Sequence, residues 1–179
     1  MRRIADHLRR EWRQHLGTLM LVLVVALGVH TWQTRHVPDG PVPDLAFILI
    51  APDGSRTLTT LNEWRARHPG QPVALHVWAD WCPICRTEEH SISRLVPGGR
   101  VLTMAMQSGD ADAVARVLAQ RGLRWPTAVD PRGDMARLLG FQAVPAFVAL
   151  DAQGHVRAAS VGYTSELGMR LRLWWAGWF

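Results

Sequence analysis

The chain has 179 residues, of which 48% are hydrophobic and 20% are charged, so its composition supports a packed core and excludes an intrinsically disordered protein. Its two cysteines are too few for a disulfide-rich scaffold. The net charge of +5 is divided between residues 1–33, with five arginines against two acids, and residues 34–179, with fifteen arginines against thirteen acids. The larger part is therefore near neutral, and its charge gives no reason to expect nucleic acid as a partner.

A basic stretch at the N-terminus is followed by an uncharged, apolar segment. Residues 16–29 are apolar apart from Thr18, and Thr31 and Trp32 can extend them to a helix of about 17 residues, just long enough to span a bilayer. Trp12 and Trp32 flank the segment, as interfacial aromatic residues often do. The basic residues before it are Arg2, Arg3, Arg9, Arg10 and Arg13. By the positive-inside rule they predict a single-pass protein with a cytoplasmic N-terminus and its remaining residues across the membrane.

Two other interpretations of this segment stay open. A cleaved signal peptide has the same layout, with residues 26–28 as a passable cleavage site, although the long basic region and the lack of a clean Ala-x-Ala favour an uncleaved anchor. A buried soluble helix is the other alternative, and charge on one side of an all-round apolar run argues against it. We therefore expect a basic cytoplasmic tail and transmembrane anchor at residues 1–33, a linker rich in proline at residues 34–43, and a domain at residues 44–179.

From residue 44 onward, strand and helix patterns alternate. Hydrophobic runs, turn residues and helix caps predict, in order, strand 45–50, strand 56–58, helix 60–67, strand 73–78, helix 83–95, strand 101–106, helix 111–121, strand 127–129, helix 134–139, strand 146–150, strand 155–159 and a last helix capped by Thr164 or Ser165. This alternation, with its terminal hairpin and helix, predicts an α/β fold in which a mixed central sheet carries helices on both faces.

The last helix ends in a segment dense in tryptophan. Leu167, Leu171, Trp174 and Trp178 fall at i, i+4, i+7 and i+11, which places them on one face of the helix. We expect a helix that packs on the sheet. The alternative is a surface patch that rests at the membrane interface near the anchor.

The only two cysteines lie between a strand and a helix. Residues 73–78 form an almost continuous apolar run, typical of a central strand, that leads to Cys82 and Cys85 at the start of a helix. There the first thiol faces unpaired backbone N–H groups and the positive end of the helix dipole, which favour thiolate over thiol. The pair predicts a redox-active disulfide that needs no other cofactor, or half of a metal site. Zinc or copper binding would use His76 and His90 as well, and it is the weaker alternative because a zinc site generally needs a second pair at matching spacing.

The residues around this pair resemble a known family. Residues 78–85, Trp-Ala-Asp-Trp-Cys-Pro-Ile-Cys, look like the W-A-x-W-C-x-x-C motif of the thioredoxin superfamily. Further matches are Glu88 as the acid after the second cysteine, Val144-Pro145 at the cis-proline position, residues 125–130 before it, the D-x-x-G hairpin at residues 151–154 and Gly162 before the last helix. The chain from about residue 43 to 179 is similar to the TlpA/ResA/DsbE-like thiol–disulfide oxidoreductases. Within that group it resembles the ScsD-type copper-sensitivity suppressor proteins.

The resemblance implies a thioredoxin-like fold and a protein disulfide oxidoreductase anchored in the bacterial inner membrane, with its domain in the periplasm. Cys82, the more exposed of the two cysteines in this motif, would attack as the thiolate, and Cys85 would resolve the mixed disulfide. Pro145, in the cis form, would present the backbone of Val144 to the incoming peptide. The partners implied are periplasmic protein thiols and disulfides, together with a membrane electron donor or acceptor.

Five further residues have expected roles near the dithiol. Glu88 would assist proton transfer, or be a solvated helix residue. His76 would accept a proton beneath the second cysteine, or be a core histidine with one satisfied hydrogen bond. Trp81, Pro83 and Ile84 would shape the surface on which a substrate docks.

Three departures from the family pattern concern the direction of electron flow. Proline comes first in Cys-Pro-Ile-Cys, whereas the family usually places it second. His90 stands where a proline often follows the acid, and His76 stands where thioredoxin carries an acid. Such changes tune the reactivity and the reduction potential of the dithiol. The direction of exchange therefore stays open, and the protein could act as a reductase, an oxidant or an isomerase.

Overall fold

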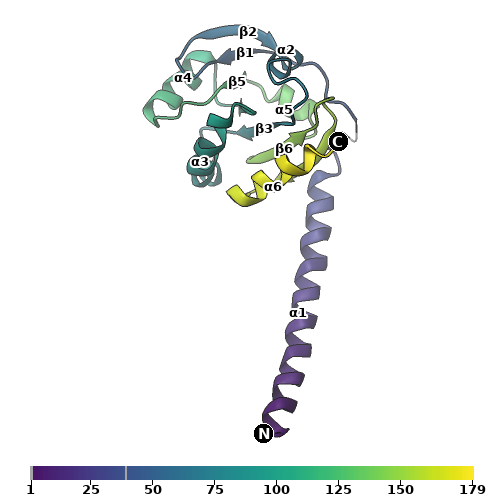
Figure 1. The fold of residues 1–179 in the computed structure, drawn as a ribbon. Coiled ribbons are helices and arrows are strands. Elements are labelled where there is room, and N and C mark those ends of the chain that lie inside the picture. The colour runs from purple at the N-terminus through teal and green to yellow at the C-terminus, as the bar shows by residue number, and fades with distance from the viewer. Residues whose placement is uncertain (1, 39) are drawn as a thin grey trace. The chain divides into compact units, whose positions relative to one another are not determined.

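The computed structural model describes residues 2–38 and 40–179, and the side chains of residues 2–11, 13 and 30 lie outside the described part. The chain forms two compact units, one that ends at Arg35 and one that runs from His36 to Phe179. Figure 1 traces the elements of both units in chain order. Each unit is described by itself.

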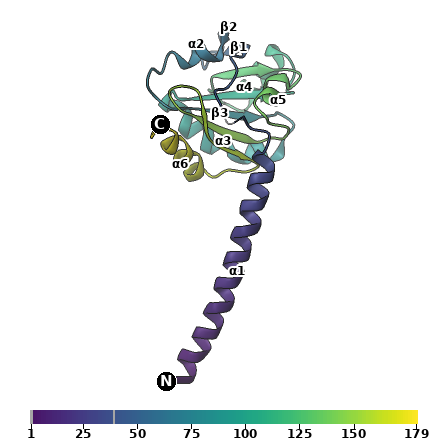
Figure 2. The same cartoon turned by 90° about the vertical axis from the view of Figure 1, so that its right-hand side faces the viewer.

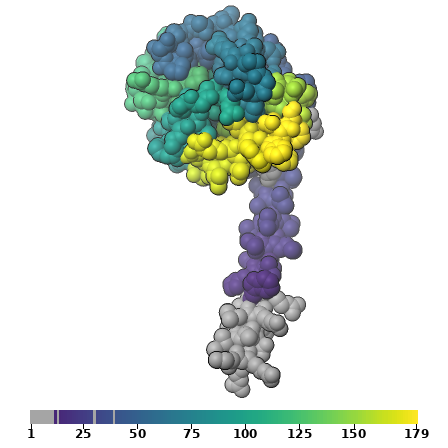
Figure 3. All heavy atoms as spheres, viewed as in Figure 1, coloured from purple at the N-terminus to yellow at the C-terminus, as the bar shows by residue number. Residues whose placement is uncertain are grey.

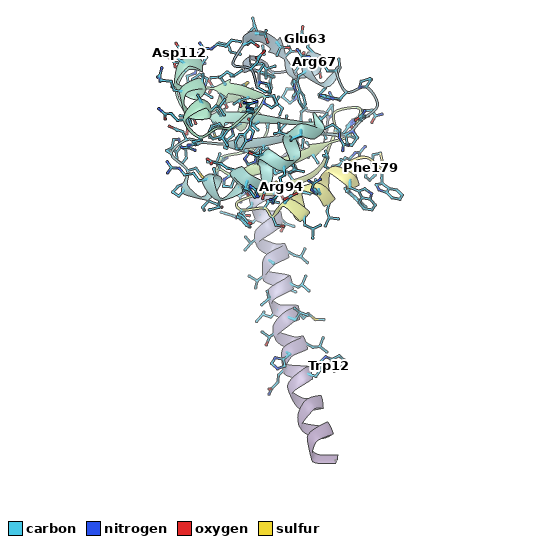
Figure 4. All side chains as sticks on the ribbon, turned by 60° about the vertical axis from the view of Figure 1, so that its left-hand side comes forward. Trp12, Glu63, Arg67, Arg94, Asp112 and Phe179 are labelled. Carbon is cyan, nitrogen blue, oxygen red and sulfur yellow. The ribbon has the colours of Figure 1, made fainter. Side chains whose placement is uncertain are left out.

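The first unit is a single helix, α1 (Arg2–Thr34). Its stretch Gln14–Thr34 has 21 residues and a mean hydropathy of 1.7, so it is long and apolar enough to cross a membrane. The large apolar side chains described along it, from Leu16 to Trp32, are exposed, which argues against a buried soluble helix. Figure 4 shows Trp12 on this helix, before the stretch begins. The five arginines of the predicted basic tail have side chains outside the described residues.

The second unit is built on one mixed sheet of seven strands in the order β2-β1-β5-β4-β3-β6-β7. The strands are β1 (Ala46–Ile50), β2 (Arg56–Thr60), β3 (Val73–Trp78), β4 (Val101–Met106), β5 (Thr127–Asp130), β6 (Ala146–Leu150) and β7 (Val156–Val161). Strand β4 runs parallel to both β3 and β5, and the other neighbours are antiparallel. Figure 2 shows the sheet turned by 90°, with β1 and β2 at the top and β3 below them.

Helices cover both faces of this sheet. The face with Trp78 and Phe147 packs against α3 (Pro83–Leu95), α4 (Ala111–Gln120) and α6 (Glu166–Ala176). The other face packs against α2 (Leu61–Arg65) and α5 (Asp134–Leu138). A short 3₁₀ helix, η1 (Val96–Gly98), follows α3. The predicted thioredoxin-like α/β fold is confirmed.

Strand β3 positions the site because it lies near the centre of the sheet and all six of its residues are buried. Side chains alternate along a strand, so Val73, Leu75 and Val77 join the core under α2 and α5. Ala74 and Trp78 join the core under α3 and α6. His76 lies two residues from each of them on the strand, so its side chain points to the same face of the sheet, toward α3.

The domain begins earlier than the proline-rich composition predicts, at His36 instead of residue 44. The N–H of Val42 donates to the carbonyl of Gly154 at 3.0 Å. The N–H of Val156 donates to the carbonyl of Gly40 at 3.4 Å. Val42 is also buried in the core. The second half of the expected linker is therefore held on the β6–β7 hairpin by backbone pairing and by one apolar side chain.

Helix α6 packs on the sheet as expected, but through a different face. Its buried side chains are Met169, Leu173 and Ala176. The predicted stripe of Leu167, Leu171, Trp174 and Trp178 is exposed. The helix thus carries two apolar stripes, and the one with the smaller and more flexible side chains fits the close-packed interface with the sheet.

Ile92 offers a test of how α3 is fixed on the sheet, because its side chain is fully buried in the core beneath that helix. We expect Ile92→Ala to lower the free energy of unfolding by about 2–5 kcal/mol through the lost burial and the cavity it leaves. Ile48→Ala is the control, because Ile48 is 42% exposed on β1, and it should lower this free energy by less than about 1 kcal/mol. Urea unfolding measures both variants, and equal effects would contradict this account of the core.

Candidate active site

Cys82 is the N-cap residue of α3, the position where a helix leaves backbone N–H groups unpaired. Its Sγ accepts the N–H of Cys85 at 3.2 Å. Pro83 suits the first position of the helix because its ring fixes φ and it has no N–H to satisfy. Both cysteines are free thiols in the structure. A negative charge on the sulfur of Cys82 is therefore stabilised by a backbone donor and by the helix dipole.

The loop before β6 lies directly against this sulfur. The Val144–Pro145 peptide bond is cis, as the resemblance implied. The S–H of Cys82 donates to the carbonyl oxygen of Val144 at 3.7 Å. The structure thus brings the predicted site residue Cys82 together with Val144 and Pro145, which lie more than 60 positions further along the chain.

Exposure does not separate the two cysteines, contrary to the expectation for this motif. Cys82 and Cys85 are each only 3% exposed. The loop of Val144 covers the sulfur of Cys82, which explains its burial. The difference between the two lies in their contacts, because Cys82 holds the helix start while Cys85 lies within the first turn of α3.

Exposed side chains surround the buried dithiol. Trp81, Pro83 and Ile84 are all exposed, as expected for residues that contact a docking partner. The indole N–H of Trp81 donates to the carbonyl of Gln107 at 3.1 Å, which ties the ring to the end of β4. Gln107 has φ of 50°, a left-handed conformation that is uncommon outside glycine.

Behind the first turn of α3 lie a carboxyl group and an imidazole, both buried. Burial raises the pKa of the Cys85 thiol, and a hydrogen bond with Cys82 adds to the effect. Burial raises the pKa of Glu88 to about 7, against the lowering effect of the Thr164 N–H, which donates to its Oε1 at 2.5 Å. Burial lowers the pKa of His76 to about 3. Glu88 is thus not the solvated residue of the simpler expectation.

His76 and Glu88 face each other without forming a hydrogen bond. His76 Nδ1 lies 3.8 Å from Glu88 Oε2, which is too long for one. Neither ring nitrogen of His76 has a hydrogen-bond partner within the described residues, so the expected single satisfied bond is not observed. The ring packs against that of Trp125 in a T-shaped arrangement, with 6.3 Å between centroids. At neutral pH the imidazole is uncharged, and the two groups do not form an ion pair.

Three residues to which the sequence assigned no role at the site hold this arrangement. Ser108 Oγ accepts the N–H of Asp80 at 3.0 Å. Arg121, just after α4, donates to the carbonyl of Asp80 and to Glu89 Oε1, at 2.9 Å in both cases. Thr164 fixes Glu88 through its N–H, while Ser165 caps α6. Only the possible helix cap at Thr164 or Ser165 marked any of these residues in the sequence.

The proposed metal ligands do not come together. Among the described residues, no group of three or more His, Cys, Asp or Glu side chains could hold a metal ion. His90 is exposed and contacts the side chain of Arg94 on the surface of α3. The set of four ligands considered for zinc or copper, with His90 as one of them, is therefore not assembled in the described residues.

Comparison with known proteins agrees with this geometry. The family model described as Redoxin matches residues 41–169. The thiol:disulfide interchange protein DsbE of Pseudomonas fluorescens biotype C is 31% identical over 168 residues, covering 88% of this chain and 90% of that protein. A thioredoxin-like protein of Haemophilus influenzae is 30% identical over 110 residues, covering 61% of this chain and 65% of that protein.

The fold has solved counterparts as well. The crystal structure of a putative thiol:disulfide interchange protein DsbE from Chlorobium tepidum superposes with a TM-score of 0.63 at 23% identity, covering 79% of this chain and 99% of that one. The Redoxin match over most of the domain and the similarity to DsbE along nearly the whole sequence show that this chain belongs to the Redoxin family, as a DsbE-like thiol–disulfide oxidoreductase of the thioredoxin superfamily.

Proposed function

We propose that the Cys82/Cys85 dithiol exchanges electrons with protein partners in the bacterial periplasm, while α1 anchors the chain in the inner membrane with its N-terminus in the cytoplasm. The observation that carries this proposal is the sulfur of Cys82, which caps α3 and touches the carbonyl of Val144 beside cis-Pro145. The apolar stretch Gln14–Thr34 and the basic residues before it support the anchor and its orientation.

In the reducing direction, the thiolate of Cys82 attacks one sulfur of a partner disulfide. That S–S bond breaks, the other partner sulfur leaves as a thiolate, and a mixed disulfide forms at Cys82. Cys85 then loses its proton and attacks the sulfur of Cys82, so the partner leaves as a dithiol. Two electrons pass to the partner, and a Cys82–Cys85 disulfide remains. The oxidising direction is the reverse, and a membrane donor or acceptor of electrons restores the starting state.

Glu88 is the group that suits the proton transfer from Cys85. Because burial raises the pKa of the Cys85 thiol, its deprotonation needs a base nearby. Glu88 lies three residues further along α3, and its pKa of about 7 lets it both accept and release a proton near neutral pH. His76, with a pKa of about 3, is a poor acceptor, so we assign it a positioning role as an uncharged neighbour of the carboxyl group.

The two cysteines have separable roles that substitution tests. We expect Cys82→Ser to abolish reduction of insulin disulfides by the full chain in the presence of dithiothreitol, because the attacking sulfur is gone. When the reduced protein is mixed with insulin in the absence of dithiothreitol, Cys85→Ser should instead accumulate a covalent mixed disulfide, because the resolving sulfur is gone. Non-reducing electrophoresis separates these outcomes, and a Cys82→Ser protein that still reduced insulin would overturn the assignment.

Glu88 is tested by the resolving step alone, measured as release of a thiol preloaded as a mixed disulfide on Cys82. In the native protein this rate should rise as the pH passes through about 7, because Glu88 then loses its proton and can accept that of Cys85. Glu88→Gln should lose this rise and be about 100-fold slower at pH 8. Asp112→Asn, an exposed site on α4, is the control and should match the native profile. A Glu88→Gln protein with the native profile would remove Glu88 from the mechanism.

His76 makes a separate prediction for stability. Its folded pKa of about 3 lies below the ordinary value of 6.5, so the unfolded chain binds a proton that the folded chain refuses. This destabilises the folded state as the pH falls from 6.5 toward 3. We compare the free energy of unfolding of His76→Leu, a change of similar volume, with that of the native protein. The difference should favour the variant more at pH 4 than at pH 7. Urea unfolding at the two values checks this; His90→Leu, on the exposed surface, should show no such gain. Equal differences at both pH values would contradict the burial of a neutral imidazole.

A further inference from the structure

Helix α6 and the residues after it expose a continuous apolar surface that the redox site does not use. We call it the α6 face; its members are Leu167, Leu171, Trp174, Trp175, Trp178 and Phe179, each between 51% and 68% exposed. The rings are ordered against one another, since Trp174 packs on Trp178 with 5.3 Å between centroids and Trp175 packs on Phe179 with 5.6 Å. Figure 3 shows the yellow atoms of this segment at the surface, next to the teal atoms of α3.

Beside this face lies a basic cavity of about 500 Å³. Trp174 and Trp178 form one side of it, and Arg94, Arg100 and Arg170 line it as well. Residues 94–100 and 166–179 together carry four arginines and one acid, Glu166. Arg94 and Arg170 both pair with Glu166, whereas Arg100 and Arg172 pair with no carboxylate in the described part of the chain. The surface therefore combines exposed indole rings with an excess of guanidinium groups.

The connection along the chain between the candidate span and the domain is short. The candidate membrane span ends at Thr34 and the domain begins at His36, a path along the chain of at most about 7 Å. From there the chain pairs with the β6–β7 hairpin, through Gly40 and Val156. The next hairpin residue, Arg157, holds its guanidinium 4.3 Å from the ring centroid of Phe179. The end of the α6 face thus lies on the same hairpin that receives the chain from the span.

We propose that the α6 face binds the surface of an anionic phospholipid bilayer, with a lipid phosphate in the arginine-lined cavity and the indole rings at the headgroup level. Tryptophan is the residue that membrane interfaces favour, and guanidinium groups bind phosphate in paired hydrogen bonds. The short tether gives a lipid surface a high effective concentration at this face, which neither a free partner protein nor a second copy has. The proposal rests on the proposed membrane anchor.

This contact leaves the surface around the dithiol uncovered. Arg94 lies in the last turn of α3, while Cys82 caps its first residue. A helix of 13 residues is about 20 Å long, so the lipid contact and the sulfur of Cys82 lie at opposite ends of α3. Figure 4 shows Arg94 near α6 and Phe179 at the end of that helix. A domain held by the α6 face can therefore still offer Cys82 to a protein partner.

The test uses residues 36–179, because the buried residues of both core clusters lie within Val42–Leu173, inside the second compact unit of the chain. We expect this domain to co-sediment with vesicles of equal parts phosphatidylcholine and phosphatidylglycerol, and to bind at least tenfold more weakly to pure phosphatidylcholine vesicles. Trp174→Ser/Trp178→Ser and, separately, Arg100→Glu should each weaken binding to the anionic vesicles at least tenfold. Leu138→Ser is the control, because Leu138 is 60% exposed on α5, under the other face of the sheet.

Insulin reduction by the same samples separates the two proposals. If the native domain reduces insulin but does not bind anionic vesicles, the lipid proposal fails while the redox proposal stands; a domain that binds vesicles without reducing insulin gives the reverse. Equal binding by Leu138→Ser and the Trp174→Ser/Trp178→Ser protein would also overturn the lipid proposal. The lipid proposal also fails if the native domain forms a dimer in sedimentation velocity and the Trp174→Ser/Trp178→Ser protein does not. It fails as well if the Arg100→Glu protein binds anionic vesicles fully in 10 mM inorganic phosphate.

Discussion

The site depends on how the first turn of α3 satisfies its backbone donors. A helix start leaves N–H groups without partners, and here the sulfur of Cys82 accepts one of them from Cys85. The same sulfur is held from the other side by the carbonyl of Val144. Strand β3 fixes where this helix begins, because a fully buried strand near the middle of the sheet cannot shift its register without exposing its core side chains. The nucleophile is therefore placed by elements that the whole domain stabilises.

Beneath this sulfur, the fold buries two polar groups that a core built for stability alone would avoid. Glu88 is satisfied on one oxygen by the N–H of Thr164, but both ring nitrogens of His76 lack hydrogen bonds in the described part of the structure. Burying an unpaired polar group costs about 1–3 kcal/mol, so this pair lowers stability and requires a compensating function. Such a function follows from the chemistry, since Cys85 must lose a proton in a place where burial disfavours its thiolate.

The sequence predicted those features of the fold and the site that are set by residues close together in the chain. The buried run of β3, the cysteine spacing and the Val144-Pro145 motif each lie within a few residues, and the structure has them as expected. The supports of the site were not predictable in this way, because Arg121 lies 41 residues from Asp80 and Thr164 lies 76 residues from Glu88. The burial of Cys82 likewise depends on a loop 62 residues away. Periodicity also misjudged α6, because a helix with two apolar stripes does not reveal which one meets the sheet.

Electrostatics links the two ends of α3. The positive end of its dipole lies at Cys82, where a thiolate develops, and its negative end lies near Arg94 in the last turn. Arg94 pairs with Glu166, which stands in the first turn of α6 at the positive end of that helix. The ion pair thus complements two helix dipoles at once, and Glu88 joins the same two segments through Thr164. Because these contacts fix α6 against α3, the exposed tryptophans keep a constant position relative to the dithiol. A surface that bound lipid there would set the direction in which Cys82 meets its partners, with no further element needed to orient the domain.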